Sequence, residues 1–157
     1  MPPPLLVDLA SLDLSTVLLD REQIQHHLPQ RYEMAQLDGL LYVDEATGLL
    51  IGYKDIREDE WWTRGHLPGR PLMPGVLMIE AAAQLAAFYH SYVLKDPRLI
   101  GFGGADKVKF REQVVPPARL LLIGKPLEVR PRRFRCYVQG VNDGRLAFEA
   151  EIAGMPI

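Results

Sequence analysis

One long apolar segment in the middle of the chain constrains the fold more than any other feature. From Val76 to about Leu94 no proline or glycine interrupts the sequence, and its alanines favour a helix. Pro74 stands where a helix can begin, because the first helical turn does not need the missing N–H. Apolar residues occupy nearly every face of the segment, which is typical of a buried helix. The rest of the fold therefore has to cover this helix.

The last third of the chain has the pattern of antiparallel strands. Apolar residues alternate with polar ones in three segments, 107–111, 133–139 and 146–152. This is the two-residue period of a sheet with one face in solvent. Asn142-Asp143-Gly144 predicts a tight turn between the last two strands. Earlier in the chain we expect a short helix and two strands, at 20–28, 37–44 and 48–56.

About six strands and one buried helix predict an α+β domain, in which a curved, mostly antiparallel sheet wraps around the helix. A single sheet can cover only part of such a helix. The uncovered part of the helix needs another surface, which indicates a dimer. The length of 157 residues fits one domain, which we place at 20–157 after an N-terminal arm at 1–19. Prolines at positions 2, 3 and 4 predict that residues 1–15 form a loose arm.

Composition and charge exclude several classes of protein. The chain is 48% hydrophobic with a formal net charge of −2, which excludes a disordered chain and gives no basic character for binding nucleic acid. The single cysteine, Cys136, predicts a buried packing residue in a reducing compartment. Glu80 interrupts the apolar segment and no basic residue precedes Arg21. We therefore expect a cytoplasmic protein with neither a membrane insertion nor a secretory signal.

His66 is the first candidate for chemistry. It lies in Gly65-His66-Leu67-Pro68-Gly69, where glycine and proline make an irregular, stiff loop that would hold the imidazole in a fixed direction. An imidazole titrates near neutral pH, so it can serve as a general base. The alternative is a loop histidine that only bonds a nearby carbonyl.

Glu80 is the second candidate, because it lies inside the buried helix. A carboxylate there is costly unless it is paired or neutral. A neutral carboxyl is what a general acid requires. The alternative is a carboxylate that bonds local groups or reaches water.

The start of the helix supplies a third feature. The N–H groups of Gly75 and Val76 have no partners within a helix, and they carry the positive end of its dipole. Such donors suit an oxygen that gains negative charge during a reaction, although an ordinary helix start explains the same residues. Together, a base, an acid and an anion site predict loss of water from a 3-hydroxyacyl thioester, with no metal and no redox cofactor.

At these residues the chain resembles the 3-hydroxyacyl-acyl-carrier-protein dehydratases of type II fatty acid synthesis. The resemblance extends over roughly 20–153 and is strongest in the segments Glu60–Trp62, Gly65–Gly69, Pro71–Leu77, Ile79–Ala81 and Ala83–Gln84. It implies a hotdog fold, in which the long helix is the sausage. It also implies a homodimer or larger homo-oligomer, where the histidine of one chain faces the glutamate of the other.

The resemblance assigns roles to individual residues and partners. His66 and Glu80 become the catalytic pair, and Gly75 the oxyanion donor. Gln84 would bond near Glu80, and Tyr32 would gate the acyl tunnel. The substrate would arrive on the phosphopantetheine arm of acyl carrier protein, to which the basic residues Lys125, Arg130, Arg132, Arg133 and Arg135 offer opposite charge. A solvated strand face explains that basic cluster equally well.

The chain departs from the family's pattern at three places, and the first two, which could reshape the tunnel mouth, leave the chain length and the carrier open. Gln30 replaces a histidine, Glu33–Gln36 replaces an apolar run, and Pro117–Arg119 replaces a common Gly-Asp pair. Two alternatives remain. One is another hotdog enzyme, a thioesterase or a CoA-thioester hydratase, although hotdog thioesterases usually need no histidine at the position of His66. The other is a non-catalytic protein that binds acyl thioesters.

Overall fold

A computed structural model of the whole chain, residues 1–157, places the apolar segment in helix α2, Gly75–Tyr92. The residue before the helix is Pro74 in an extended conformation, as the sequence predicts. Most of the side chains of α2 are buried, and Ala81, Leu85 and Phe88 have no solvent exposure. No helix in the structure combines the length and the apolar character that a membrane crossing needs.

The strands form one antiparallel sheet of six, in the order β1-β2-β4-β5-β6-β3. Their bounds are Gly39–Val43 for β1, Leu50–Ile56 for β2, Ile100–Phe110 for β3, Ala118–Arg130 for β4, Arg133–Asn142 for β5 and Arg145–Pro156 for β6. The predicted turn at Asp143-Gly144 joins β5 to β6, and both turn residues have positive φ, 50° and 74°. Strand β3 pairs only with β6, so one of its edges is free.

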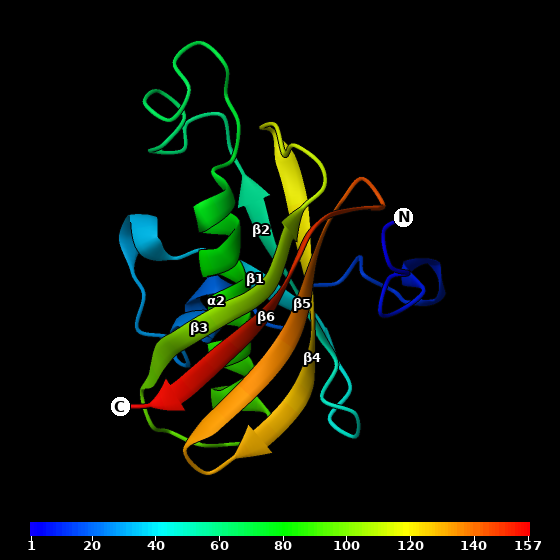
Figure 1. Cartoon of the computed structure of the whole chain (residues 1–157), viewed down its shortest axis with the longest axis vertical. Coiled ribbons are helices and arrows are strands. Elements are labelled where there is room, and N and C mark those ends of the chain that lie inside the picture. The colour runs from blue at the N-terminus through cyan, green and yellow to red at the C-terminus, as the bar shows by residue number, and fades with distance from the viewer.

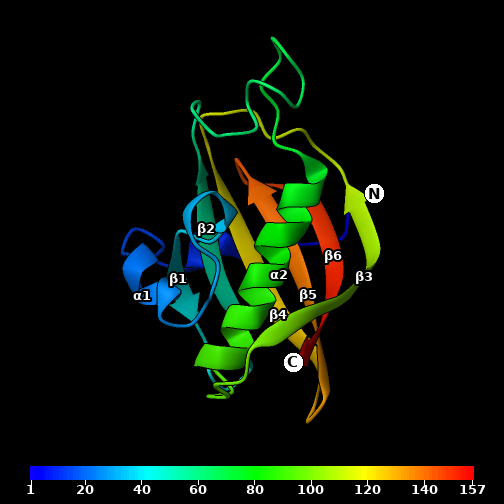
Figure 2. The same cartoon turned by 90° about the vertical axis from the view of Figure 1, so that its left-hand side faces the viewer.

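The sheet curves around α2 on one side and leaves the other side of the helix less covered (Figures 1 and 2). Core residues from the helix, such as Leu85 and Phe88, pack with Leu120, Leu122 and Phe148 of the strands. This is the α+β arrangement that the sequence predicts, the hotdog fold. Cys136 is buried as expected, and burial raises the pKa of its thiol to about 12.

The first helix is shorter than the predicted segment 20–28. Helix α1 runs from Arg21 to Gln25 and begins at a capping box, in which Asp20 accepts a hydrogen bond from the N–H of Gln23 and the Gln23 side chain accepts from the N–H of Asp20. Ile24 is buried in the core. A single turn is enough to bury this one apolar residue.

The prediction of a loose arm at 1–15 is wrong. Leucines from Leu5 to Leu14 pack on the outer face of the sheet against Ile51, Ile123 and Val141. The fully buried Gln139 fixes the arm, because its Oε1 accepts from the N–H of Leu6 at 2.8 Å and its Nε2 donates to the carbonyl of Pro4 at 3.0 Å. The outer face carries apolar residues here, and burying them stabilises the packed arm.

The segment between β2 and α2 is irregular, as its glycines and prolines predict. It projects beyond the N-terminal end of α2, away from the body of the domain (Figures 1 and 2). It carries the sequence Gly65–Gly69 and leads directly into the start of the helix. The position of His66 therefore depends on how this loop is anchored.

Candidate active site

Glu80 lies in the second turn of α2 and is partly buried. Its Oε1 accepts a hydrogen bond of 2.9 Å from Nε2 of Gln84, one turn further along the helix. The amide of Gln84 is 2% exposed and is fully engaged. Its Nε2 also donates to the carbonyl of Met34 at 2.7 Å, and its Oε1 accepts from the N–H of Gln36 at 2.8 Å. The carboxyl of Glu80 is thus held by a side chain that is itself fixed.

Helix η2 runs from Tyr32 to Met34. This helix and the residues just after it support the arrangement through their backbone groups. Gln84 contacts main-chain atoms of Met34 and Gln36, and the Gln36 side chain donates to the carbonyl of Glu33 at 2.8 Å. The side chains at Glu33–Gln36 depart from the resembled family. Because the link to Gln84 uses backbone groups, that departure leaves it intact.

A cavity of about 150 Å³ lies beside Glu80, between α2 and strands β3 and β6. Eight of its thirteen lining residues are hydrophobic, among them Ala83, Ala87, Phe102 and Ile152. Glu80 and Gln84 are polar groups in this lining. A hydrocarbon chain can lie against such walls while its reacting end meets the carboxyl of Glu80.

The N-terminal end of α2 presents free backbone donors. The first intrahelical bonds are donated by Leu77 and Met78, which reach the carbonyl of Pro74 at 3.0 and 3.2 Å. The N–H groups of Gly75 and Val76 precede them and have no such partner. A Cβ atom at Gly75 would lie 2.9 Å from the ring of Phe110, which covers this position. Glycine is therefore the residue that lets the ring lie against the helix start.

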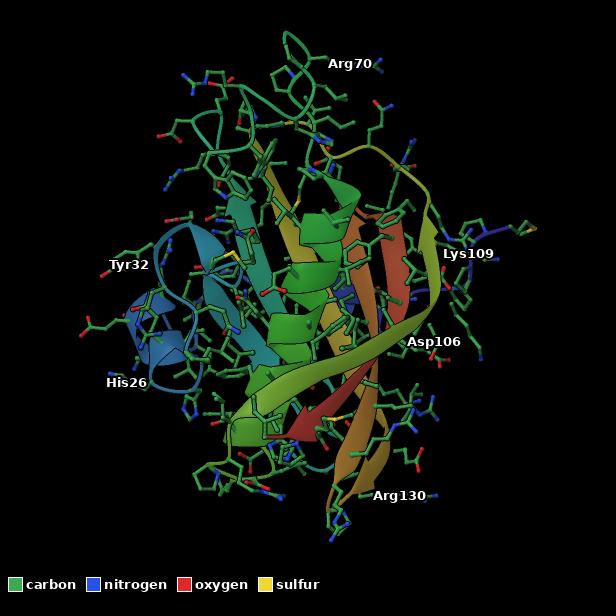
Figure 3. All side chains as sticks on the ribbon, turned by 60° about the vertical axis from the view of Figure 1, so that its left-hand side comes forward. His26, Tyr32, Arg70, Asp106, Lys109 and Arg130 are labelled. Carbon is green, nitrogen blue, oxygen red and sulfur yellow. The ribbon has the colours of Figure 1, made fainter.

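His66 lies in the projecting loop, and its side chain is exposed. Its N–H donates to the carbonyl of Trp62 at 2.9 Å, and Trp62 is buried in the core with 4% exposure. The imidazole does not line the cavity beside Glu80. Within one chain, the structure thus leaves His66 outside the cavity that Glu80 lines, and Figure 3 shows how far Arg70, in the same loop, stands from α2.

A buried ion-pair network anchors the base of this loop, and the sequence analysis missed it. Nζ of Lys54, in β2, lies 3.5 Å from Oδ2 of Asp38 and 3.7 Å from Oε2 of Glu60. The same oxygen of Glu60 accepts from the N–H of Arg57 at 2.9 Å. The signal in the sequence was the position of Lys54, which is two residues from Gly52 and from Ile56 along β2, so its side chain lies on the same inward face.

We expect Lys54→Met to lower the free energy of unfolding by about 3 kcal/mol, because it leaves the buried Glu60 without a cation and Asp38 with only the more exposed Arg21. Urea denaturation followed by circular dichroism measures this. The control is Lys125→Met, the same change at an exposed lysine of β4, which should shift stability by less than about 0.5 kcal/mol. Equal effects for the two variants would show that the network does not stabilise the fold.

Comparison with known proteins shows which family the chain resembles in sequence. Residues 28–151 match the FabA-like domain. The chain belongs to the FabA-like family. A 3-hydroxyacyl-[acyl-carrier-protein] dehydratase FabZ from Moorella thermoacetica is 39% identical over 138 residues, which cover 85% of this chain and 94% of that protein.

Solved structures share the fold of this FabA-like chain at low sequence identity. The dehydratase heterocomplex ApeI:P from Xenorhabdus doucetiae matches with a TM-score of 0.72 and 15% identity, covering 85% of this chain and 90% of the other. A hypothetical thioesterase with coenzyme A from Streptococcus pneumoniae matches with a TM-score of 0.62 and 8% identity, covering 87% and 95%. At these identities the matches support the hotdog fold alone.

Tyr32 lies apart from the cavity in this FabA-like chain. Its side chain is 84% exposed and points away from α2 (Figure 3), and its backbone has a positive φ of 56°. It lines a separate surface hollow with Arg57 and Trp61. The structure therefore gives Tyr32 no place in the wall of the cavity beside Glu80.

The basic residues of the β4–β5 hairpin are partly neutralised. Arg130 and Arg135 both pair with Glu128, and Arg135 also pairs with Glu151 at 3.0 Å. Arg132 and Arg133 are exposed. This hairpin lies at the opposite end of the domain from the projecting loop, as the label of Arg130 in Figure 3 shows.

Proposed function

We propose that this chain dehydrates 3-hydroxyacyl thioesters carried by acyl carrier protein, giving trans-2-enoyl thioesters. The observation that carries the proposal is the Glu80 carboxyl, fixed by Gln84 at the wall of an apolar cavity. Membership of the FabA-like family and 39% identity to a named dehydratase of this class support the same reaction.

The mechanism assigns one role to each group. The His66 imidazole removes a proton from C2 of the substrate, as a general base. The N–H groups of Gly75 and Val76 donate to the thioester oxygen as it gains charge. Glu80 gives its proton to the hydroxyl at C3, which leaves as water while the electron pair from C2 forms the double bond. His66 then returns its proton to the Glu80 carboxylate through solvent, so that protons balance over one cycle.

We propose that the working form contains at least two copies of the chain. One copy leaves His66 outside its own cavity, so a second copy would supply the histidine. Two surfaces favour such a pairing: the free edge of β3, with Phe102 and Phe110 exposed at 59% and 52%, and the uncovered side of α2, with Val76 exposed at 73%. Exposed apolar groups beside a free strand edge are typical of an interface.

The same proposal places the protein in the cytoplasm, where its substrates would arrive on the phosphopantetheine arm of the carrier. Arg64 and Arg70 are both exposed in the loop that carries His66. Their positive charge would attract the phosphate of that arm and an acidic carrier.

The direct test offers 3-hydroxybutyryl and 3-hydroxyoctanoyl groups to the purified protein, each on acyl carrier protein and on coenzyme A. Absorbance reports the enoyl product, and a thiol reagent reports hydrolysis. We expect enoyl product without free thiol, formed faster from the carrier-bound substrates. Thiol release without enoyl product would identify a thioesterase instead, and binding without turnover a non-catalytic protein.

A further inference from the structure

Gln30, Ala87 and Ile100 line the far end of the cavity beside Glu80, and the same three residues line a groove of about 710 Å³ that is open to solvent. The cavity and the groove therefore adjoin at these residues. Strand β3, which begins at Ile100, crosses over the C-terminal half of α2 (Figure 2), and its first residue lies where the cavity meets the groove.

The cavity alone is too small for a long acyl chain. A cavity of about 150 Å³ holds a ligand about the size of benzene, or about six carbons. From Glu80 to Ala87 the helix advances about 10 Å. A longer tail must then pass Ala87 and enter the groove.

Gln30, which lines both hollows, carries a polar group without a partner. The side-chain oxygen of Gln30 is buried and accepts no hydrogen bond. Buried polar atoms of this kind are few in native proteins, and each needs a partner that the chain itself does not supply. At the junction of the cavity and the groove, that partner would be water or a polar part of a bound molecule.

The groove is cationic. Its basic lining residues are His26, His27, Arg31, Lys95 and Arg98, and it contains no aspartate or glutamate. Arg98 is paired with Asp96, and burial lowers the pKa of His27, so neither adds free charge at neutral pH.

Two cations in the groove have no carboxylate partner. Arg31 donates to the backbone carbonyls of Gln25 and Leu28, and Nζ of Lys95 lies over the ring of Tyr92. A purely apolar tail gains nothing from such cations, whereas a carboxylate at its end does.

We infer that the acyl site is open at its far end, and that the enzyme accepts 3-hydroxyacyl thioesters whose tails pass between Gln30 and Ala87, favouring tails that end in a carboxylate held in the groove. This inference rests on the proposed dehydratase function. It names the substrate class by the shape and the charge of the site.

The first test narrows the passage with Ala87→Leu, which keeps a good helix former. We expect the ratio of kcat/KM for 3-hydroxydodecanoyl to that for 3-hydroxybutyryl carrier protein to fall by about tenfold or more. Ala46→Leu, the same change at an exposed turn residue, should leave this ratio as in the wild type. If Ala87→Leu also leaves the ratio unchanged, the open end is disproved.

The second test compares two long substrates of equal length, one ending in methyl and one in carboxylate. In the wild type we expect the carboxylate-ended substrate to have the higher kcat/KM. Lys95→Gln should lower its kcat/KM by about threefold and leave that of the methyl-ended substrate unchanged. Equal effects on both substrates, or a wild-type preference for the methyl end, would refute the assigned class. No turnover of 3-hydroxybutyryl carrier protein by the wild type would instead refute the dehydratase function itself.

Discussion

We expect the His66→Ala variant to dehydrate 3-hydroxyacyl carrier protein about a thousandfold more slowly than the wild type, with the loss mainly in kcat. The imidazole is the base that removes the C2 proton, and alanine cannot accept it. The fold should be unchanged, because the exposed side chain of His66 makes no hydrogen bond within the chain and only its N–H is used, by Trp62.

His26→Ala is the matched control for this variant. His26 is also exposed, and it lies at the end of α1, beside the groove rather than in the projecting loop (Figure 3). With 3-hydroxybutyryl carrier protein, whose tail ends inside the cavity, we expect His26→Ala to keep the wild-type kcat. Circular dichroism and thermal melting show whether each variant is folded. A folded His66→Ala variant with the wild-type kcat would refute the assignment of the base.

Much of the fold could be predicted from local patterns. The uninterrupted apolar segment predicts α2, and two-residue alternation predicts β5 and β6, because these features depend only on neighbouring residues. The packing of the arm could not be predicted in this way. It depends on Gln139, more than a hundred residues away in sequence, which bonds Leu6 and Pro4.

The contacts of the candidate site are likewise of two kinds, local ones that the sequence predicts and long-range ones that it does not. Glu80 and Gln84 are one helical turn apart, so their hydrogen bond follows from spacing on a helix. The bonds from Gln84 to Met34 and Gln36, and the pairing of Lys54 with Asp38 and Glu60, join distant segments. No periodicity in the sequence encodes these contacts. The shared lining of the cavity and the groove likewise appears only once β3 is placed over α2.

We expect Glu80→Gln to lower kcat by about a hundredfold or more, because an amide cannot give a proton to the departing hydroxyl. The change keeps the shape of the side chain and an oxygen that can accept from Gln84, so the link to Met34 and Gln36 should survive. Assay of enoyl product under the conditions used for His66→Ala measures the effect. Wild-type activity in a folded Glu80→Gln variant would exclude this carboxyl as the acid.

Mixing the two inactive variants tests where each half of the site comes from. Chains with His66→Ala and chains with Glu80→Gln, carrying different affinity tags, are expressed together and the mixed dimer is isolated. If a histidine from one copy acts with the glutamate of the other, one of the two sites is intact, and the mixed dimer regains about half of the wild-type rate. If both groups came from one chain, the mixed dimer would stay inactive.

The reciprocal mixture completes this test. A dimer of one wild-type chain and one chain with both substitutions has no intact site if the pair acts between copies, since each site then lacks one member. It would keep about half of the wild-type rate if the pair acted within a chain. Because His66 lies outside the cavity that Glu80 lines in a single copy, we expect activity in the first mixture and none in the second.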